Sequence, residues 1–223
     1  MNVSNSIKAL IIFYLIFVNG LLTGCSQQRS IQRERFAESL ERNVVRELNL
    51  ARQNPARYAA FLEQLKPYYV GKYIKRPGKP AIITNEGVAA LDEAIRFLKY
   101  AKPVGALKYS EGLSRAALDH VLDQGPTGKT GHLGTDGKNF QQRIRKYGEW
   151  KNTIGENIAY GRNDARDIIA GLIIDDGVPG RGHRKNIFNP EFKAVGVAFG
   201  SHALYSYMCV TDFAGGFIEK NKR

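Results

Sequence analysis

The stretch AVGVAFGSHALYSYMCVTDF, residues 194–213, indicates the fold class of the C-terminal part of the chain. It contains two runs rich in β-branched and aromatic residues, 194–199 and 205–213, with the turn sequence Gly200-Ser201-His202-Ala203 between them. Two such runs around a short turn predict an antiparallel pair of strands.

The residues ahead of this pair predict helices. Apolar residues recur at a spacing of four in 36–48, and Asn54-Pro55 is typical of a helix N-terminus. Further amphipathic helices are expected over 88–98, after Ser110, around 140–144 and after Asp164, whereas 66–83 is expected to be irregular. Helices followed by late strands, without alternating βαβ units, predict an α+β layered domain.

The first 24 residues have the pattern of a signal peptide. Their apolar run, 7–18, is interrupted by Lys8 alone and is too short for a spanning helix of about 20 residues. The sequence Leu21-Leu22-Thr23-Gly24-Cys25 resembles a bacterial lipobox, which implies cleavage before Cys25 and acylation of its thiol. A secretory signal with an incidental cysteine is the alternative. We expect a lipidated tether over 25–33, one domain over 34–217 and a polar basic tail over 218–223.

This organisation predicts a bacterial envelope protein attached to a membrane by its lipid. Ser26 stands where an aspartate often marks inner-membrane retention, so the outer membrane is expected in a Gram-negative host. Loss of Lys8 with the signal lowers the net charge from +12 to +11 over the remaining 199 residues. Anionic envelope polymers or lipids are then more plausible partners than nucleic acid, although solvated basic loops would account for the charge equally simply.

The cysteine count also bears on stability. If Cys25 is lipidated, Cys209 is the sole remaining thiol, so the domain has no internal disulfide and depends on its core. Cys209 lies in an apolar strand run and is expected to be inert. We expect a monomer.

Two histidines occur in Gly-rich, polar segments, with an acidic motif between them. The three segments are GHLGTDG, GENIAYG and GRGHRKN, at 131–137, 155–161 and 180–186. Imidazoles and carboxylates from separated segments can form a metal site or a proton-transfer site, which makes His132, Glu156 and His183 candidate site residues. Each also has a structural interpretation: turn capping, backbone hydrogen bonding or a helix start. Asn157 and Asn186 are expected to fix loops.

The other two histidines are expected to be structural. His120 lies within a predicted helix and is expected to be packed or on the surface, and His202 is expected to be solvated in the hairpin turn.

These segments, together with LNLARQNP at 48–55 and VGVA at 195–198, resemble a bacterial CAP domain, also called SCP, over roughly 41–213. The resemblance implies a three-layer α-β-α sandwich with a mostly antiparallel central sheet and a cleft holding two histidines and two acidic residues. It places His132, Glu156 and His183 in that cleft. Asp175 stands where other members have a glutamate, and Asp176 is the alternative in another helix register.

Three functions follow as hypotheses. We favour a lipid-anchored protein whose cleft binds a ligand, with Arg181 and Arg184 either clamping an anion or simply exposed. Zn²⁺ or another divalent cation could bind His132, His183, Glu156 and Asp175.

The second hypothesis is a hydrolase of envelope peptides or peptidoglycan, in which Glu156 acts as general base beside His132 and His183. The third is a lipid-binding module. The sequence contains neither H-E-x-x-H nor G-x-S-x-G, so no particular reaction is implied.

Overall fold

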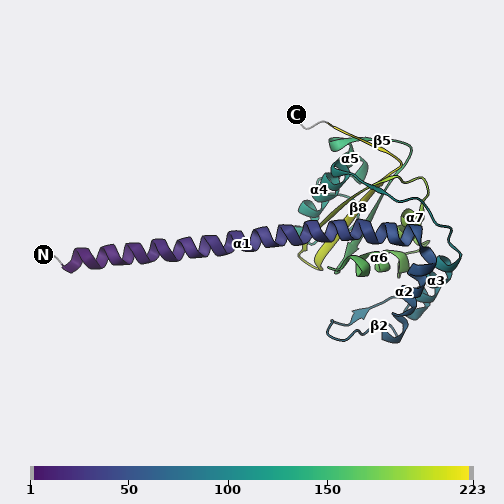
Figure 1. Ribbon diagram of the computed structural model, residues 1–223, viewed down its shortest axis with the longest axis horizontal. Helices are drawn as coiled ribbons and strands as arrows, with labels where there is room; N and C mark the ends of the chain where they lie inside the picture. The colour runs from purple at the N-terminus through teal and green to yellow at the C-terminus, as the bar shows by residue number, and fades with distance from the viewer. Residues whose placement is uncertain (1–2, 221–223) are drawn as a thin grey trace. The chain divides into compact units, whose positions relative to one another are not determined.

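The computed structural model describes the backbone of residues 3–220 and the side chains of 27–220 except that of Arg29. The chain forms two compact units, Met1–Ser39 and Leu40–Arg223. Helix α1 (Val3–Gln53) includes the backbone of the predicted tether (Figure 1). The side chain of Cys25 lies outside the described residues, so its lipidation stays a prediction. Within the described part of the chain, no helix has the length and apolar character needed to span a bilayer.

The second unit contains six further helices among the described residues. They are α2 (Pro55–Glu63), α3 (Val88–Tyr100), α4 (Glu111–Thr127), α5 (Phe140–Tyr147), α6 (Ala165–Ile174) and α7 (Gly182–Phe188), with a 3₁₀ turn at Lys66–Tyr68.

Local sequence signals determine where several of these helices start. Pro55 is the first residue of α2, as predicted. Ser110 Oγ accepts the Leu113 N–H at the start of α4, which confirms that predicted cap. Helix α3 instead follows Gly87, whose N–H donates to Thr84 Oγ1. Side-chain oxygens therefore satisfy free helical N–H groups close to the expected positions.

The central sheet has the strand order β4-β7-β8-β6. Its strands are β4 (Lys108–Tyr109), β6 (Ile154–Tyr160), β7 (Ala194–His202) and β8 (Ser206–Ala214). Strands β4 and β7 are parallel, whereas β7–β8 and β8–β6 are antiparallel. The predicted strand pair is therefore confirmed as β7 and β8. Strand β6, which carries Glu156, was not predicted from the sequence, and it forms an edge of this sheet.

Two small sheets accompany the central one. Strands β1 (Tyr69–Val70), β2 (Tyr73–Ile74) and β3 (Ile82–Ile83) give the expected irregular segment some order. Strand β5 (Gly148–Trp150) pairs with β9 (Phe217–Glu219). Because β9 extends two residues past the predicted domain boundary at 217, the C-terminal tail starts later than expected.

Helices cover both faces of the central sheet. On one face, α4 lies so close to β7 that a Cβ on Gly196 would stand 2.1 Å from the Leu113 carbonyl carbon. The core on this side consists of Ala117, Val121, Ile158, Ala198, Met208 and Val210. On the other face, β6 contacts α6 and α7, and the Phe213 ring stacks on Phe192. This arrangement is the α+β sandwich, with the sheet as its middle layer.

Arg52, near the end of α1, holds several segments of this second face. Its buried guanidinium donates hydrogen bonds to the carbonyls of Gly105, Ile187, Asn189 and Phe192, over 2.6–3.3 Å. The C-terminal end of α1 is thereby fixed to the C-terminal end of α7.

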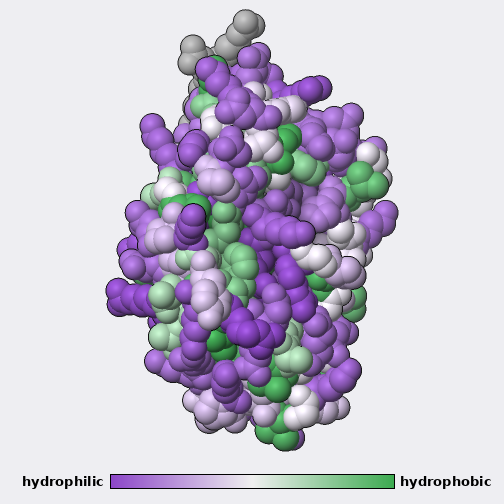
Figure 2. All heavy atoms as spheres, turned by 90° about the vertical axis from the view of Figure 1, so that its right-hand side faces the viewer, coloured by the Kyte–Doolittle hydropathy of each residue, from purple (hydrophilic) through white to green (hydrophobic). Residues whose placement is uncertain are grey.

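Several basic residues in the ranges 66–79 and 138–151 are paired with acids. Arg76 and Lys79 both bond Asp167, Lys66 pairs with Asp92, and Lys146 pairs with Asp119. The face in Figure 2 is mostly hydrophilic, with apolar residues in a narrow central region. A role for the basic residues toward anionic polymers stays a prediction.

Candidate functional site

His132 and Glu156 form the first half of the candidate site. His132 Nδ1 lies 2.7 Å from Glu156 Oε1, and the Arg143 guanidinium donates to Glu156 Oε2 over 2.5 Å. The Glu156 side chain is 0% exposed, whereas that of His132 is 48% exposed. Because a carboxylate accepts the Nδ1–H, the neutral ring keeps Nε2 as a free acceptor. Glu156 therefore orients an imidazole that solvent can reach.

Asp212 lies beside Glu156 and was not predicted as a site residue. The two residues are register partners on β8 and β6, so their side chains share one face of the sheet. Asp212 is fully buried, and among the described residues no group donates to either of its carboxyl oxygens. Burial and the negative charge of Glu156 raise the pKa of Asp212 well above its ordinary value. Asp212 is therefore the carboxyl group of this pair that favours the protonated form.

Glu156 itself stays ionised. Burial alone would raise its pKa, but the hydrogen bond from His132 and the charge of Arg143 outweigh burial and lower it. The pKa values of the two neighbouring carboxyl groups are thus shifted in opposite directions, as expected when like charges adjoin in a buried site.

The loop that carries His132 is fixed on both sides of that residue. His120 Nε2 lies 2.9 Å from the Gly131 carbonyl, and Gln124 Nε2 donates to the carbonyls of Gly131 and Leu133 over 3.0 Å each. The Tyr160 hydroxyl accepts the Gly131 N–H. His120 is therefore a packed histidine, as expected, and it helps to hold the loop.

His183 and Asp175 form the second half. His183 Nδ1 lies 2.6 Å from Asp175 Oδ1, while Asp175 Oδ2 accepts the backbone N–H groups of His183 and Arg184. Asp175 ends α6 in the left-handed conformation, with φ 56°, which turns its side chain toward the start of α7. Its side chain is 1% exposed, and that of His183 is 23% exposed. This half repeats the arrangement of a buried carboxylate behind an accessible ring.

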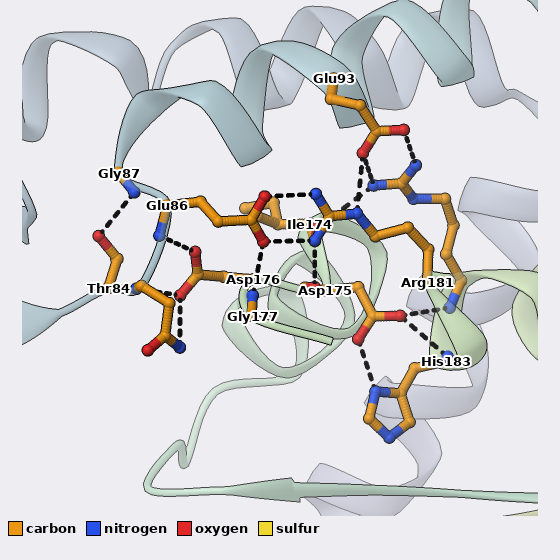
Figure 3. A network of polar contacts seen from close by, with 12 residues as sticks. Thr84, Glu86, Gly87, Glu93, Ile174, Asp175, Asp176, Gly177, Arg181 and His183 are labelled. Atoms are coloured by element: carbon orange, nitrogen blue, oxygen red, sulfur yellow. Dashed lines mark hydrogen bonds and ion pairs between the residues drawn. The ribbon is translucent and has the colours of Figure 1, made fainter. Parts of the chain in front are cut away.

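Asp176 and the two arginines have other partners (Figure 3). Asp176 accepts the backbone N–H groups of Asn85 and Glu86, so Asp175 is the carboxylate that pairs with His183. Arg181 pairs with Glu86 and Glu93, and Arg184 pairs with Glu93. Both guanidinium groups contact carboxylates, so neither arginine is the simply exposed residue of one alternative, and Arg184 is buried. Clamping of an anion by either arginine stays a prediction.

Strand β6 connects the two halves. Glu156 and Asn157 are successive on it, so their side chains point to opposite faces of the sheet. Asn157 Nδ2 donates to the His183 carbonyl over 3.0 Å, and Asn186 Nδ2 donates to Asn157 Oδ1 over 2.8 Å. The two asparagines were expected to fix loops, but they bond helix α7 to strand β6. The two histidines consequently approach β6 from its two sides.

A cleft of about 690 Å³ adjoins β6. His183 and Asp175 line it together with residues of β6, α6 and the segment of β1–β3. His132 and Glu156 are not among its lining residues, so this cleft contains one half of the predicted set.

The described residues do not form a complete metal site. Among them, no three His, Cys, Asp or Glu side chains are arranged to hold an ion. The carboxylates of Glu156 and Asp175 are already bonded to imidazole and to Arg143 or backbone N–H groups.

Two expectations outside the cleft have clear outcomes. His202 is not solvated: it is 2% exposed, its Nε2 lies 2.9 Å from the Lys129 carbonyl, and its ring packs against Tyr160 and Tyr205. The prediction was wrong because the hairpin turn folds back over β6. Cys209 is a buried thiol, as expected, and burial raises its pKa to about 12.

The comparisons with known proteins point to one family. The sequence model described as "CAP: Cysteine-rich secretory protein family" matches residues 48–213. No protein among the curated sequences matches the chain.

Three solved structures from bacteria resemble it. An extracellular protein containing an SCP domain from Bacillus anthracis has 21% identity and a TM-score of 0.41, covering 50% of this chain and 34% of that one. An outer surface protein from Borrelia burgdorferi has 19% identity and a TM-score of 0.43, covering 52% and 80%. A cysteine-rich secretory protein from Staphylococcus aureus has 17% identity and a TM-score of 0.38, covering 70% and 48%. This chain therefore spans about a third of the Bacillus chain and about half of the Staphylococcus chain.

Proposed function

Since the chain belongs to the CAP family of cysteine-rich secretory proteins, we propose that it is an exported, lipid-anchored envelope protein that binds a ligand beside β6, through the imidazoles of His132 and His183. The observation that carries this proposal is the repeated pairing of an accessible histidine with a buried carboxylate. In each pair the carboxylate fixes the ring through Nδ1 and leaves Nε2 for a hydrogen bond or coordination.

The same ring orientation is common among metal-binding histidines. Here, however, both carboxylates are occupied, and zinc sites normally take at least three protein ligands. The residues present offer two imidazole nitrogens and do not fit a tightly held resident ion. We therefore propose that the imidazoles bind the ligand directly.

The hydrolase hypothesis assigns Glu156 the role of general base, which requires contact with a water or substrate. Its side chain is 0% exposed, and both oxygens have partners. Glu156 is thus better suited to positioning His132 than to taking a proton from a bound molecule. No other described carboxylate pairs with His132, so we do not propose a hydrolytic reaction.

Calorimetric titration of the purified protein with soluble peptidoglycan fragments tests the binding proposal. We expect saturable binding that is lost in the His132→Ala/His183→Ala double variant, with the His120→Gln variant as a control for loop position. Binding that is equal in the wild type and the double variant would overturn the role of the imidazoles. Titration with zinc belongs in the same experiment: a tight one-to-one site lost in the double variant would assign both rings as metal ligands instead.

The anchor is proposed on the lipobox-like sequence ending at Cys25. Membrane fractionation of cells expressing the wild type or Cys25→Ala tests it. We expect the wild-type chain with the membranes and the variant in the soluble exported fraction. Equal membrane association of the two would contradict lipidation at Cys25.

A further inference from the structure

The free edge of β6 presents backbone groups to the cleft. The Gly161 N–H donates to the Tyr207 carbonyl over 2.9 Å, so this residue faces the partner strand β8. Bonding direction alternates along an antiparallel strand, and therefore the N–H and C=O groups of Ile158 and Tyr160 point away from β8. Within residues 3–220, no hydrogen bond reaches these four groups on that side.

The same groups border the cleft. Ile158 and Tyr160 both line it, yet the Ile158 side chain is buried in the core beneath α4 and is 6% exposed. Ile158 therefore meets the cleft chiefly through its main chain. A cleft-facing strand edge with unpaired donors and acceptors can accept an added strand.

Arg162 follows this edge directly and brings a cation into the cleft. Its guanidinium lies against Gly171: a Cβ on that glycine would stand 2.8 Å from Arg162 Cζ. In the described part of the chain no hydrogen bond or ion pair involves the Arg162 guanidinium, while burial lowers its pKa. The glycine thus makes room for a partly desolvated positive charge with no direct partner.

The acidic side chains that line the cleft are not partners of the Arg162 guanidinium. Asp167 is bonded to Arg76 and Lys79, Asp175 is bonded to His183, and Asp176 is bonded to the N–H groups of Asn85 and Glu86. The carboxylates of Asp167 and Asp176 act on Arg162 electrostatically, but neither contacts its guanidinium. A carboxylate supplied by a ligand would complete its hydrogen bonding.

We infer that the cleft receives an extended peptide segment, which adds a strand to the edge of β6 at Ile158 and Tyr160 and places a carboxylate on Arg162. This inference rests on the proposed ligand-binding function and names the class of ligand. Donors and acceptors that repeat every second residue, about 6.8 Å apart, match a polypeptide backbone. A hydrocarbon chain entering the same cleft would leave them unsatisfied.

Selection from a displayed random hexapeptide library tests the inference on the purified protein. We expect the wild type to enrich acidic peptides and Arg162→Gln to bind the selected peptides at least tenfold more weakly. Gly171→Ala should weaken binding in the same direction, because the added methyl displaces the guanidinium while its charge is kept. Arg96→Gln, which removes an exposed arginine on α3, is the matched control and should bind like the wild type. Thermal melting checks that each variant folds.

Two chemical changes to a selected peptide separate its backbone from its charge. The selected peptide can be methylated at its odd-numbered or at its even-numbered backbone nitrogens. One of these two forms should bind at least tenfold more weakly than the unmethylated peptide, whereas the other should bind with little change. Amidation of the C-terminus, compared with Asp→Asn or Glu→Gln within the peptide, identifies which carboxylate Arg162 receives. Equal binding of both methylated forms would overturn strand addition, and equal binding of all neutralised forms would overturn the assignment of Arg162.

Amide hydrogen exchange observes the strand edge itself. In the free protein, the amides of Ile158 and Tyr160 should exchange at least a hundredfold faster than that of Ala159, and a bound peptide should slow them. Bound peptide without such protection would contradict the inference.

The outcomes also separate the inference from the proposed function. Failure to select any peptide, while peptidoglycan fragments still bind in a histidine-dependent manner, would overturn the inference and leave the proposed function intact. Histidine-independent binding of those fragments would instead overturn the proposed function.

Discussion

The carboxylates behind His132 and His183 are held in two different ways. Glu156 lies within a strand and is fixed by the Arg143 guanidinium, with Asp212 beside it. Asp175 lies at a helix end and is fixed by the backbone N–H groups of His183 and Arg184. One half of the site therefore depends on a buried opposite charge, and the other depends on backbone geometry. The same ring orientation has been reached by two physical means, which should respond differently to mutation and pH.

The largest expected effect comes from removing the opposite charge. Arg143→Met leaves Glu156 buried without its cation, which should lower the free energy of unfolding by about 3–5 kcal/mol. Urea denaturation measures it, with Arg143→Lys as the control that keeps the charge. A loss below about 1 kcal/mol would show that Asp212 and His132 alone stabilise Glu156.

A smaller effect is expected at the helix end. Asp175→Asn keeps a residue that tolerates the left-handed conformation but weakens the bond to His183, and should cost about 1–2 kcal/mol. Asp175→Ala should cost more, because it also loses both backbone contacts. Denaturation of the two variants side by side measures this order. Equal losses would mean that the hydrogen bonds of Asp175 contribute little to stability.

Asp212 should give the first half a pH dependence. Because its folded-state pKa is raised, the unfolded chain releases this proton at lower pH than the folded chain does. Its contribution to stability is therefore present below the ordinary Asp pKa of 3.8 and declines as pH rises toward the folded-state value.

Asp212→Asn removes this titration and keeps the size of the side chain. The stability of the variant relative to the wild type should rise with pH above about 4, by up to about 1.4 kcal/mol per pH unit within the window. Denaturation midpoints from pH 4 to 8 measure the difference. Parallel pH profiles for the two proteins would mean that Asp212 is ionised when folded.

The smallest effects on stability should come from the rings themselves. His132→Ala removes an accessible side chain together with its bond to buried Glu156, and should lower the free energy of unfolding by about 1 kcal/mol. Thermal melting compares it with His120→Ala, which removes a buried ring that holds the loop and should cost clearly more. A larger loss at His132 would mean that the ring is structural rather than available to a ligand.

Much of the fold followed from local patterns in the sequence. The run before and after the 200–203 turn predicted β7 and β8, and Pro55 and Ser110 marked helix starts because their chemistry is local. Strand β6 was not predicted, because the polar residues Glu156 and Asn157 interrupt the apolar pattern of GENIAYG. Only pairing with β8 turns that segment into a strand.

The features of the candidate site also divide into those that local sequence patterns predict and those that depend on distant residues. Pairing of Asp175 rather than Asp176 with His183 depends on the left-handed end of α6, which the sequence left open. The partners of Arg181 and Arg184 lie on another helix and the loop before it, around ninety residues away, so no local pattern identifies them. The sequence did contain one indication that Asp212 is a site residue. It is the only acidic residue in the strand run 205–213, and a buried carboxylate needs a polar or charged neighbour.

Arg52 has a consequence for mechanics. A pull on the chain from the side of its N-terminus reaches the second unit at Leu40 and then runs along α1 toward Arg52. There the load is shared among four backbone carbonyls in two segments, one at Gly105 and the other over residues 187–192. Several hydrogen bonds must then break together before α1 can slide. The C-terminal end of α1, beside the candidate site, should therefore resist a force along the helix axis. Arg52→Ala should lower the force that is needed to pull α1 away from the rest of the second unit.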